Sequence, residues 1–181
     1  MNLKNRFYLG LAGLLIAVTP HIQAVEADFQ QEVRVDAKRQ SIDIQKGIIS
    51  FFEDVSVTQG TLKIFADTLQ VEQSAGAGKE VLIAAGEPAK FSQLLENGRT
   101  MTAEAKEIRY RLADKTLILT GGATLTQQDS VVQGELIRYD IAKQKLVAES
   151  GKQEGDRVTT IFLPEQLQQQ LGQKDEEEDT E

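Results

Sequence analysis

Apolar and polar residues alternate through the body of the chain, between residues 25 and 163, and this period of two is typical of β-strands with one buried face. β-branched and aromatic residues occupy many of the apolar positions. Short polar turns are expected at Lys46-Gly47, Asn97-Gly98, Asp114-Lys115 and Ala142-Lys143. Asn-Gly favours a hairpin turn because both residues tolerate positive φ. The pattern predicts an all-β fold, a meander of many antiparallel strands.

An internal repeat supports the same prediction. Residues 49–59 recur as residues 83–93 and again as residues 117–127, with a spacing of 34 residues both times. A period in this range marks stacked supersecondary units, and helical repeats of similar length exist, so the residue types must decide between helices and strands. Here each unit alternates β-branched or aromatic residues with polar ones, and Gly, Asp-Val or Gly-Gly interrupts it near its middle. These features indicate strands separated by turns.

One parity of the strands is apolar, and the other carries Lys, Arg, Glu, Gln and Thr. Because side chains alternate between the faces of a sheet, the apolar parity predicts one interior face, which the sheet must cover by folding over as a sandwich, jelly roll or open barrel. A packed core and a lipid-lined groove use the same residue types, so this pattern leaves both interpretations open. The expected interior residues are Ile42, Ile44, Val57, Leu69, Val71, Phe91, Ile108, Tyr110, Leu112, Leu125, Ile137, Tyr139 and Ile141.

The first 24 residues match a secretory signal peptide. Lys4 and Arg6 form a basic start, residues 7–18 are mostly apolar, and a break precedes a cleavage position after Ala24, with cleavage after Ala27 as the second choice. The apolar run is shorter than the roughly 20 residues that a membrane-spanning helix needs, which favours cleavage over an uncleaved anchor. After cleavage, the mature chain would begin with the β-domain, which we expect to span residues 25–163.

The last segments of the chain differ from the β-domain. Residues 164–172 predict a short helix, with Pro164 at its start, leucines four residues apart and Gly172 at its end. Residues 173–181 include six acidic residues among the last seven, and such a block is typical of a solvated, disordered tail.

Composition excludes several kinds of site. The 181-residue chain has no Cys, and its one His is His21, inside the predicted signal peptide. The mature protein would therefore lack catalytic triads, thiol nucleophiles and imidazole or thiolate metal ligands. The segment 76–80 only superficially resembles a phosphate-binding loop, because Glu80 stands where Ser or Thr is needed. We expect a non-enzyme with no catalytic residue, metal or cofactor.

Charge argues against one class of partner. The formal charge is −8, and removal of residues 1–24 would delete two cations and no acid, which leaves −10. No stretch has the density of Lys and Arg that phosphate neutralisation requires, so nucleic acid is not an expected partner. Export without disulfides suggests the bacterial periplasm.

Several segments carry a family resemblance. The most specific is VSVTQGTLKIFAD at residues 55–67, because a repeating sheet does not in general require this string. Residues 33–43, 86–91, 119–123 and 157–160 extend the resemblance, which covers about residues 30–170. With these segments the chain resembles the OstA-like family of periplasmic lipopolysaccharide-transport proteins, although residues 29–32 match only loosely and the acidic tail is not part of the motif.

The resemblance implies a twisted, V-shaped, open β-jelly roll of some sixteen antiparallel strands, whose apolar interior holds the lipid A acyl chains of lipopolysaccharide. It also implies head-to-tail assembly with further copies of the chain. The implied partners are LptC of the inner-membrane complex and the LptD/LptE translocon of the outer membrane, so that the assembly bridges the two membranes.

Candidate site residues follow from parity and from position at the two ends of the sheet. At the N-terminal edge, Arg34, Lys38 and Arg39 could meet lipid phosphates or an acidic partner edge, or could block unwanted strand pairing. Residues expected to line the lipid groove are Val33, Val35, Ile44, Val57, Val71, Phe91, Tyr110, Leu112, Leu125 and Tyr139. Those expected at the edges are Val33, Arg34, Val35, Lys38 and Arg39 at the N-terminal edge and Val158, Thr160 and Phe162 at the C-terminal edge.

Two further interpretations differ in class from a lipid-conducting bridge. One is a structural or glycan-binding periplasmic β-sandwich with a closed core and monomeric behaviour. The other is an LptC-like protein that keeps residues 7–23 as a membrane anchor, which the N-terminus of the mature protein would distinguish.

Overall fold

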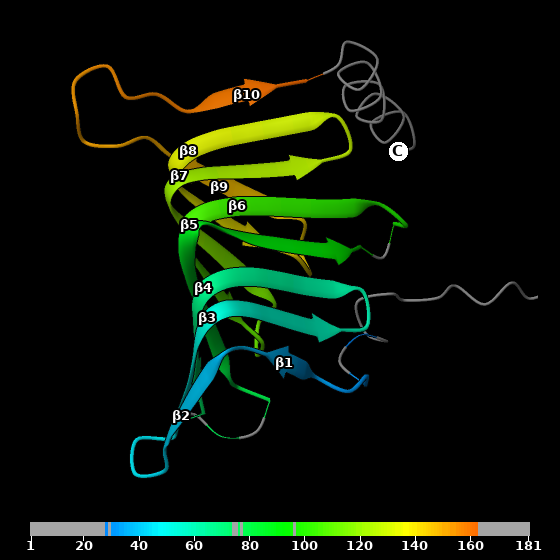
Figure 1. The fold of residues 1–181 in the computed structure, drawn as a ribbon. Coiled ribbons are helices and arrows are strands. Elements are labelled where there is room, and N and C mark those ends of the chain that lie inside the picture. Colours follow the sequence, from blue (N-terminus) through cyan, green and yellow to red (C-terminus); the bar gives the residue numbers. More distant parts are fainter. Residues whose placement is uncertain (1–27, 29, 74–75, 77, 96, 163–181) are drawn as a thin grey trace, which may run out of the picture.

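The computed structural model describes residue 28 and residues 30–162, apart from 74–75, 77 and 96. These residues form one antiparallel sheet of ten strands in which β3 to β8 follow one another in both sequence and space, which confirms the all-β prediction (Figure 1). The predicted signal peptide, short helix and acidic tail lie outside the described residues. The strands are β1 (Arg34–Asp36), β2 (Arg39–Asp43), β3 (Ile48–Gln59), β4 (Leu62–Glu72), β5 (Val81–Leu94), β6 (Thr100–Arg111), β7 (Thr116–Gln127), β8 (Ser130–Asp140), β9 (Lys145–Glu149) and β10 (Thr159–Ile161).

Each neighbouring pair among β3 to β8 has an irregular register near its middle. In β3 and β4, for example, Phe52 pairs with Thr68, and the next regular pair is Val55 with Ala66. The other four pairs shift in the same way. Since such bulges bend a strand and increase its twist, a line of them across the sheet folds it over. Figure 1 shows the long strands curving at one side of the molecule, so that their halves lie in two layers.

The bend divides the sheet into two arms, which we call arm A and arm B. Arm A contains residues 48–52, 68–72, 81–85, 107–111, 116–120 and 136–140, with β2 at one end and β9 at the other. Arm B contains residues 55–59, 62–65, 89–94, 100–104, 123–127 and 130–134, with β1 at one end and β10 at the other. With both halves of the six bent strands and the four short strands counted, the described residues contain the sixteen segments implied by the family resemblance.

The repeat of 34 residues is the repeat of the bend. Glu53 and Asp54 in β3 have φ of 67° and 52°, and Gly121 and Gly122 in β7 have φ of 85° and 59°. Gly86 to Pro88 occupy the corresponding place in β5. These interruptions were predicted to be turns, but they are bends inside continuous strands. The polar turns predicted near Gly47, Gly98, Lys115 and Lys143 do lie between strands.

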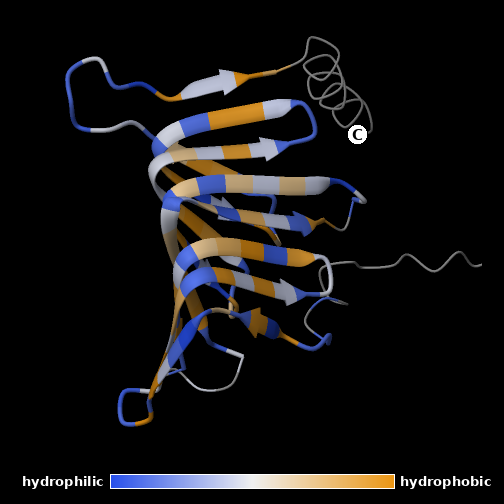
Figure 2. Ribbon diagram, in the orientation of Figure 1, coloured by the Kyte–Doolittle hydropathy of each residue, from blue (hydrophilic) through white to orange (hydrophobic). Residues whose placement is uncertain are grey.

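The inner faces of the two arms pack against each other. Strand pairing places Val71, Leu82, Tyr110, Leu117 and Tyr139 in one cross-strand row of arm A. A row of arm B in turn contains Ile64, Phe91, Ala103 and Leu125. Figure 2 shows hydrophobic and hydrophilic residues alternating along the strands that carry these rows. Most of the predicted interior set is buried here, including Leu69, Ile108 and Ile137.

Two predicted interior residues are uncovered because they lie at the end of the sheet. Ile42 in β2 pairs with Ile49 and so shares its inner face, but no further strand among the described residues covers it, and it is 57% exposed. Ile44 is 89% exposed, and its assignment to the groove is wrong. β2 ends at Asp43, whose carboxylate accepts a hydrogen bond of 3.0 Å from the Lys46 N–H, so Ile44 lies in the turn rather than on a strand face.

The two glycines at the bend of β7 offer a test of this geometry. A Cβ on Gly121 would lie 2.9 Å from Cβ of Lys106, whereas a Cβ on Gly122 would meet nothing within 4 Å. Both residues have positive φ, so either alanine should cost about 1–2 kcal/mol from backbone strain. We expect Gly121→Ala to lower the free energy of unfolding in urea by clearly more than Gly122→Ala. Equal losses would contradict the close approach of β6 and β7 at the bend.

Candidate functional site

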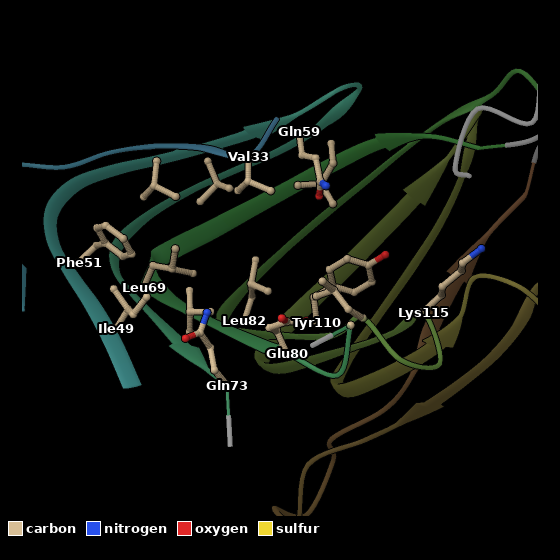
Figure 3. Close-up of a pocket in the computed structure, with 16 residues that line it drawn as sticks. Val33, Ile49, Phe51, Gln59, Leu69, Gln73, Glu80, Leu82, Tyr110 and Lys115 are labelled. Carbon is tan, nitrogen blue, oxygen red and sulfur yellow. The ribbon is translucent and has the colours of Figure 1, made fainter. Parts of the chain in front are cut away.

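An apolar cavity of about 650 Å³ lies between the arms at the end of the sheet that begins with β1 and β2. Arm A contributes Ile49, Phe51, Leu69, Val71, Leu82 and Tyr110, and arm B contributes Val57, Gln59 and Leu62. Figure 3 shows Ile49 and Phe51 at one side of the cavity and Tyr110 at the other. The volume is within the range of small-molecule sites, about 300–1,000 Å³.

Strand register explains why this wall is continuous. Ile49 pairs with Val71, Val71 with Leu82, and Leu82 with Tyr110, so their side chains share one face of arm A. On the other arm, Val35 of β1 pairs with Val57 and extends the apolar face to the edge of the sheet. Six residues predicted for the groove line this cavity: Val33, Val35, Val57, Val71, Tyr110 and Leu112.

Sequence reasoning did not select several lining residues. Ile49 was noticed in the repeat but not assigned to the groove, and Phe51 and Leu82 were not assigned either, although strand pairing places each of them opposite Leu69 or Val71. Polar side chains of Gln59, Gln73, Glu80 and Lys115 also line the cavity. Parity within β3 could have identified Ile49 and Phe51, which share the parity of Val57, whereas Leu82 has the parity opposite to that of Phe91 because the register shifts at the bend of β5.

A second cavity of about 460 Å³ lies between the arms at the opposite end of the sheet. Its lining includes the predicted residues Leu125, Tyr139, Thr160 and Phe162, together with Val132 and Leu146. Polar residues are more frequent here than in the first cavity, and they are Asn97, Arg99, Gln127, Gln128, Ser130, Gln144 and Thr160.

A tightly packed core separates the two cavities. Met101, Leu117 and Leu119 are completely buried in it. Phe91, which was predicted to line the groove, is 2% exposed and is not among the residues that line either cavity. Its ring meets that of Tyr110 edge to face, with centroids 5.6 Å apart and planes at 68°, so this aromatic pair joins arm B to arm A at the inner side of the first cavity.

A buried carboxylate anchors the chain that leads into β1. Asp28 is 4% exposed, and its Oδ1 accepts a hydrogen bond of 2.7 Å from the Thr61 N–H. Its Oδ2 accepts hydrogen bonds from the Thr61 hydroxyl at 2.6 Å and from Gln93 Nε2 at 3.0 Å. A Cβ on Gly60 would collide with the same carboxylate, so this glycine leaves room for it. We call Asp28, Thr61 and Gln93 the Asp28 clasp.

The clasp positions one wall of the first cavity. Asp28 lies only a few residues before Val33 and Val35, and Gln59 Nε2 also donates a hydrogen bond of 3.3 Å to the Gln31 carbonyl. These contacts hold the entry segment against the end of arm B. Sequence reasoning missed Asp28, although Gln59 and Gln93 occupy equivalent positions of the repeat and could have drawn attention to this end of the strands.

Two basic residues of the N-terminal edge are paired with nearby acidic residues, one in β1 and one in β3. Arg34 Nε donates to Asp36 Oδ2 at 2.9 Å, and Lys38 Nζ lies 2.5 Å from Asp54 Oδ2. Hydrogen bonds to these carboxylates raise the pKa of Arg34 and Lys38. Arg39 lies over the Phe52 ring, 4.3 Å from its centroid. The edge therefore does not present a patch of unpaired positive charge through Arg34 and Lys38.

At the other end, β10 pairs with arm B through Thr160 and Val132. Val158 is 39% exposed and Phe162 is 40% exposed, and both flank this short strand. Thr160 and Phe162 line the second cavity, whereas Val158 does not. The predicted C-terminal edge residues thus lie on or beside β10.

The described residues contain neither a metal-binding cluster nor a membrane-spanning helix. None of their His, Cys, Asp and Glu side chains form a group of three or more that could hold a metal ion. In the same part of the chain, no helix has the length and apolar character required to cross a membrane.

Comparisons with known proteins give the chain its relatives. Residues 34–145 match the family model described as "LptA/(LptD N-terminal domain) LPS transport protein". The lipopolysaccharide export system protein LptA of Escherichia coli K12 is 40% identical over 166 residues, which cover 91% of this chain and 89% of that protein. LptA of Haemophilus influenzae is 35% identical over 175 residues, which cover 95% of this chain and 99% of that protein.

A solved structure is also similar. It is the crystal structure of LptH, described as the LptA homologous periplasmic component of the lipopolysaccharide transport device of Pseudomonas aeruginosa. The two folds align with a TM-score of 0.69 and 26% sequence identity, over 76% of this chain and 99% of LptH.

The Asp28 clasp should contribute measurably to stability. Asp28→Ala removes the acceptor for three donors, two of them on half-buried Thr61 and one on buried Gln93, and we expect it to lower the free energy of unfolding by about 3 kcal/mol. Urea denaturation measures this loss. Asp36→Ala is the matched control, because Asp36 lies in an exposed ion pair and its removal should leave the midpoint nearly unchanged. Similar midpoints for the two variants would contradict a structural role of the clasp.

Proposed function

The chain belongs to the LptA/(LptD N-terminal domain) family of LPS transport proteins, and we propose that it carries lipopolysaccharide across the periplasm with the lipid A acyl chains held between its two arms. The observation that carries this proposal is the apolar cavity of about 650 Å³, which opens at the end of the sheet and continues the hydrophobic interior. Binding of this kind requires no chemical step, in keeping with the transport function in the names of the relatives.

The hydrophobic effect explains why such a carrier needs an apolar interior. Each CH₂ group of an acyl chain costs about 0.8 kcal/mol in water, so a chain of about a dozen carbons loses on the order of 10 kcal/mol outside an apolar lining. Val33, Val35, Val57, Val71, Tyr110 and Leu112 supply such a lining in the first cavity. In the second cavity, Leu125 and Tyr139 supply it.

The same open ends support head-to-tail assembly. β1 and β2 at one end, and β9 and β10 at the other, each pair with a neighbour on one side only among the described strands. Such edges can pair with another chain by β-augmentation. Ile42 continues the inner apolar face at the N-terminal end and is 57% exposed, so an added strand would cover it. Further copies of this chain, LptC and LptD/LptE are the partners that we propose for these edges.

Export through a cleaved signal peptide is part of the proposal. Either expected cleavage, after Ala24 or after Ala27, would leave Asp28 in the mature protein, so the Asp28 clasp would remain. Determination of the N-terminal residue of the protein isolated from cells separates this proposal from an anchored, LptC-like protein, which would retain residues 7–23. The alternative of a structural or glycan-binding sandwich is less well supported, because its core would be closed where the first cavity is open.

Photo-crosslinking tests lipid binding with two phenylalanines on opposite faces. Phe51 lines the first cavity, whereas Phe65 is 52% exposed and outside both cavities. We replace each in turn with p-benzoylphenylalanine, irradiate cells that make lipopolysaccharide, and detect adducts with an antibody against the glycan. An adduct is expected at Phe51 and not at Phe65.

The result would contradict the proposal if both positions gave equal adducts or if Phe51 gave none. In either case crosslinking would give no support for a lipid path between the arms, and the structural alternative would be preferred. Folding of each variant is verified by its circular dichroism spectrum and melting temperature, so that a negative result cannot come from an unfolded chain.

Assembly is tested by a second matched pair. Ile42→Lys places a charge on the uncovered inner face of β2, and Phe65→Lys makes the same kind of change at a similarly exposed residue outside the edges. We expect the mean mass in sedimentation velocity to rise with concentration for the parent protein and for Phe65→Lys. For Ile42→Lys the rise should require at least about tenfold higher concentration, since a buried unpaired charge is costly. Identical behaviour of the two variants would exclude Ile42 from the interface.

A further inference from the structure

Two tyrosines that line the cavities have buried hydroxyls with no hydrogen-bond partner among the described residues. The buried side-chain atoms without a partner among the described residues are Tyr110 Oη, Tyr139 Oη and Gln93 Oε1. Tyr110 is 1% exposed and lines the first cavity, and Tyr139 is 3% exposed and lines the second. Each cavity therefore has one unpartnered phenol in its wall.

The two phenols occupy one cross-strand row. Tyr110 pairs with Leu117, and Leu117 pairs with Tyr139. Neighbouring strands lie about 4.8 Å apart, so the two residues are separated by roughly 10 Å across the sheet. Leu117 between them is completely buried. The tyrosines thus stand on the two sides of the packed core, each on the wall that faces an opening.

Hydrocarbon packing alone does not explain these hydroxyls. A buried hydroxyl without a partner is destabilising, and phenylalanine would fill nearly the same volume without this cost. Phe91, which packs against Tyr110 from the opposite arm, shows that a ring without a hydroxyl is accommodated in this interior. Burial raises the pKa of both tyrosines, and nearby Asp28 and Asp140 add to the effect at Tyr110 and Tyr139 respectively. Both phenols therefore remain protonated donors at neutral pH.

We propose that the groove selects acyl chains that carry an additional oxygen atom along the hydrocarbon, as a hydroxyl or a carbonyl, and that Tyr110 and Tyr139 donate hydrogen bonds to this oxygen. The inference rests on the proposed function, in which the groove holds acyl chains. A plain hydrocarbon chain would leave both hydroxyls unpaired, whereas an oxygen at the matching depth satisfies one of them. Selection of this kind is effective because the penalty for an unpaired buried donor is removed only by the correct ligand.

Matched fatty acids measure this selection. The probes are tetradecanoic acid and a series of hydroxytetradecanoic acids that differ only in the position of the hydroxyl, and their Kd values are measured by displacement of a fluorescent fatty acid. At least one hydroxylated isomer should bind the parent protein about fivefold more tightly than tetradecanoic acid, as expected for one neutral hydrogen bond.

The variants are Tyr110→Phe and Tyr139→Phe, with Phe51→Ala as the control. Each Tyr→Phe variant should lose the preference for the isomers whose hydroxyl the replaced tyrosine contacts. It should still bind tetradecanoic acid at least as tightly as the parent protein does. Neither change should lower the melting temperature, because no protein partner is lost. Phe51→Ala removes only apolar wall and should weaken the binding of all probes by the same factor.

The outcomes distinguish failure of the inference about the tyrosine hydroxyls from failure of the proposed acyl-chain groove. If tetradecanoic acid binds the parent protein and no isomer is preferred, or if both Tyr→Phe variants keep every preference of the parent, the inference about the hydroxyls is wrong and the acyl-chain groove stands. If neither tetradecanoic acid nor any isomer binds, the groove proposal and the inference fail together. A lower melting temperature for either Tyr→Phe variant would show that the hydroxyl has a structural partner, which overturns its assignment to the ligand.

Discussion

A single sheet with one apolar face must cover that face, and in this protein the bend across the six long strands provides the cover. Bulges at the same level of neighbouring strands let the inner face of arm A meet that of arm B without a second sheet or a helix. The bend also needs backbone conformations that most residues avoid, at Glu53 and Asp54 and again at Gly121 and Gly122. The core, the cavities and the edges all follow from where this bend lies.

Because the cover is the sheet itself, the core closes in the middle and opens at its ends. Strands β5 to β7 have neighbours on both sides, and their inner residues, such as Met101 and Leu117, are fully buried. The end strands have a neighbour on one side only, and there the arms leave cavities of about 650 and 460 Å³. Stability and ligand access are thus provided by different parts of one sheet. The Asp28 clasp fits this division, because it adds buried hydrogen bonds at an end where apolar packing is incomplete.

The sequence predicted the all-β class, the antiparallel meander and most of the interior, because period-2 alternation and the 34-residue repeat are properties of the chain alone. It could not distinguish a bulge from a turn at Gly121, since glycine with positive φ serves in both. Parity failed at Ile44 because alternation in the sequence continues past the last residue of β2. It could not tell that Phe91 lies beneath the cavity wall, nor that Asp28 reaches Gln93, since both depend on contacts between distant strands.

The edges show how a chain with open strand ends can limit unwanted pairing. Arg34 and Lys38 are neutralised by Asp36 and Asp54, so no strong net charge directs an approaching strand to β1. Exposed ion pairs of this kind contribute little to stability, and their partners can be exchanged at small cost. Charged side chains on an edge nevertheless disfavour nonspecific association. In the proposed assembly, specificity would therefore come from the continuous apolar inner face, which ends at Ile42. Only a partner strand that both pairs with the edge backbone and continues this apolar face would cover the Ile42 side chain.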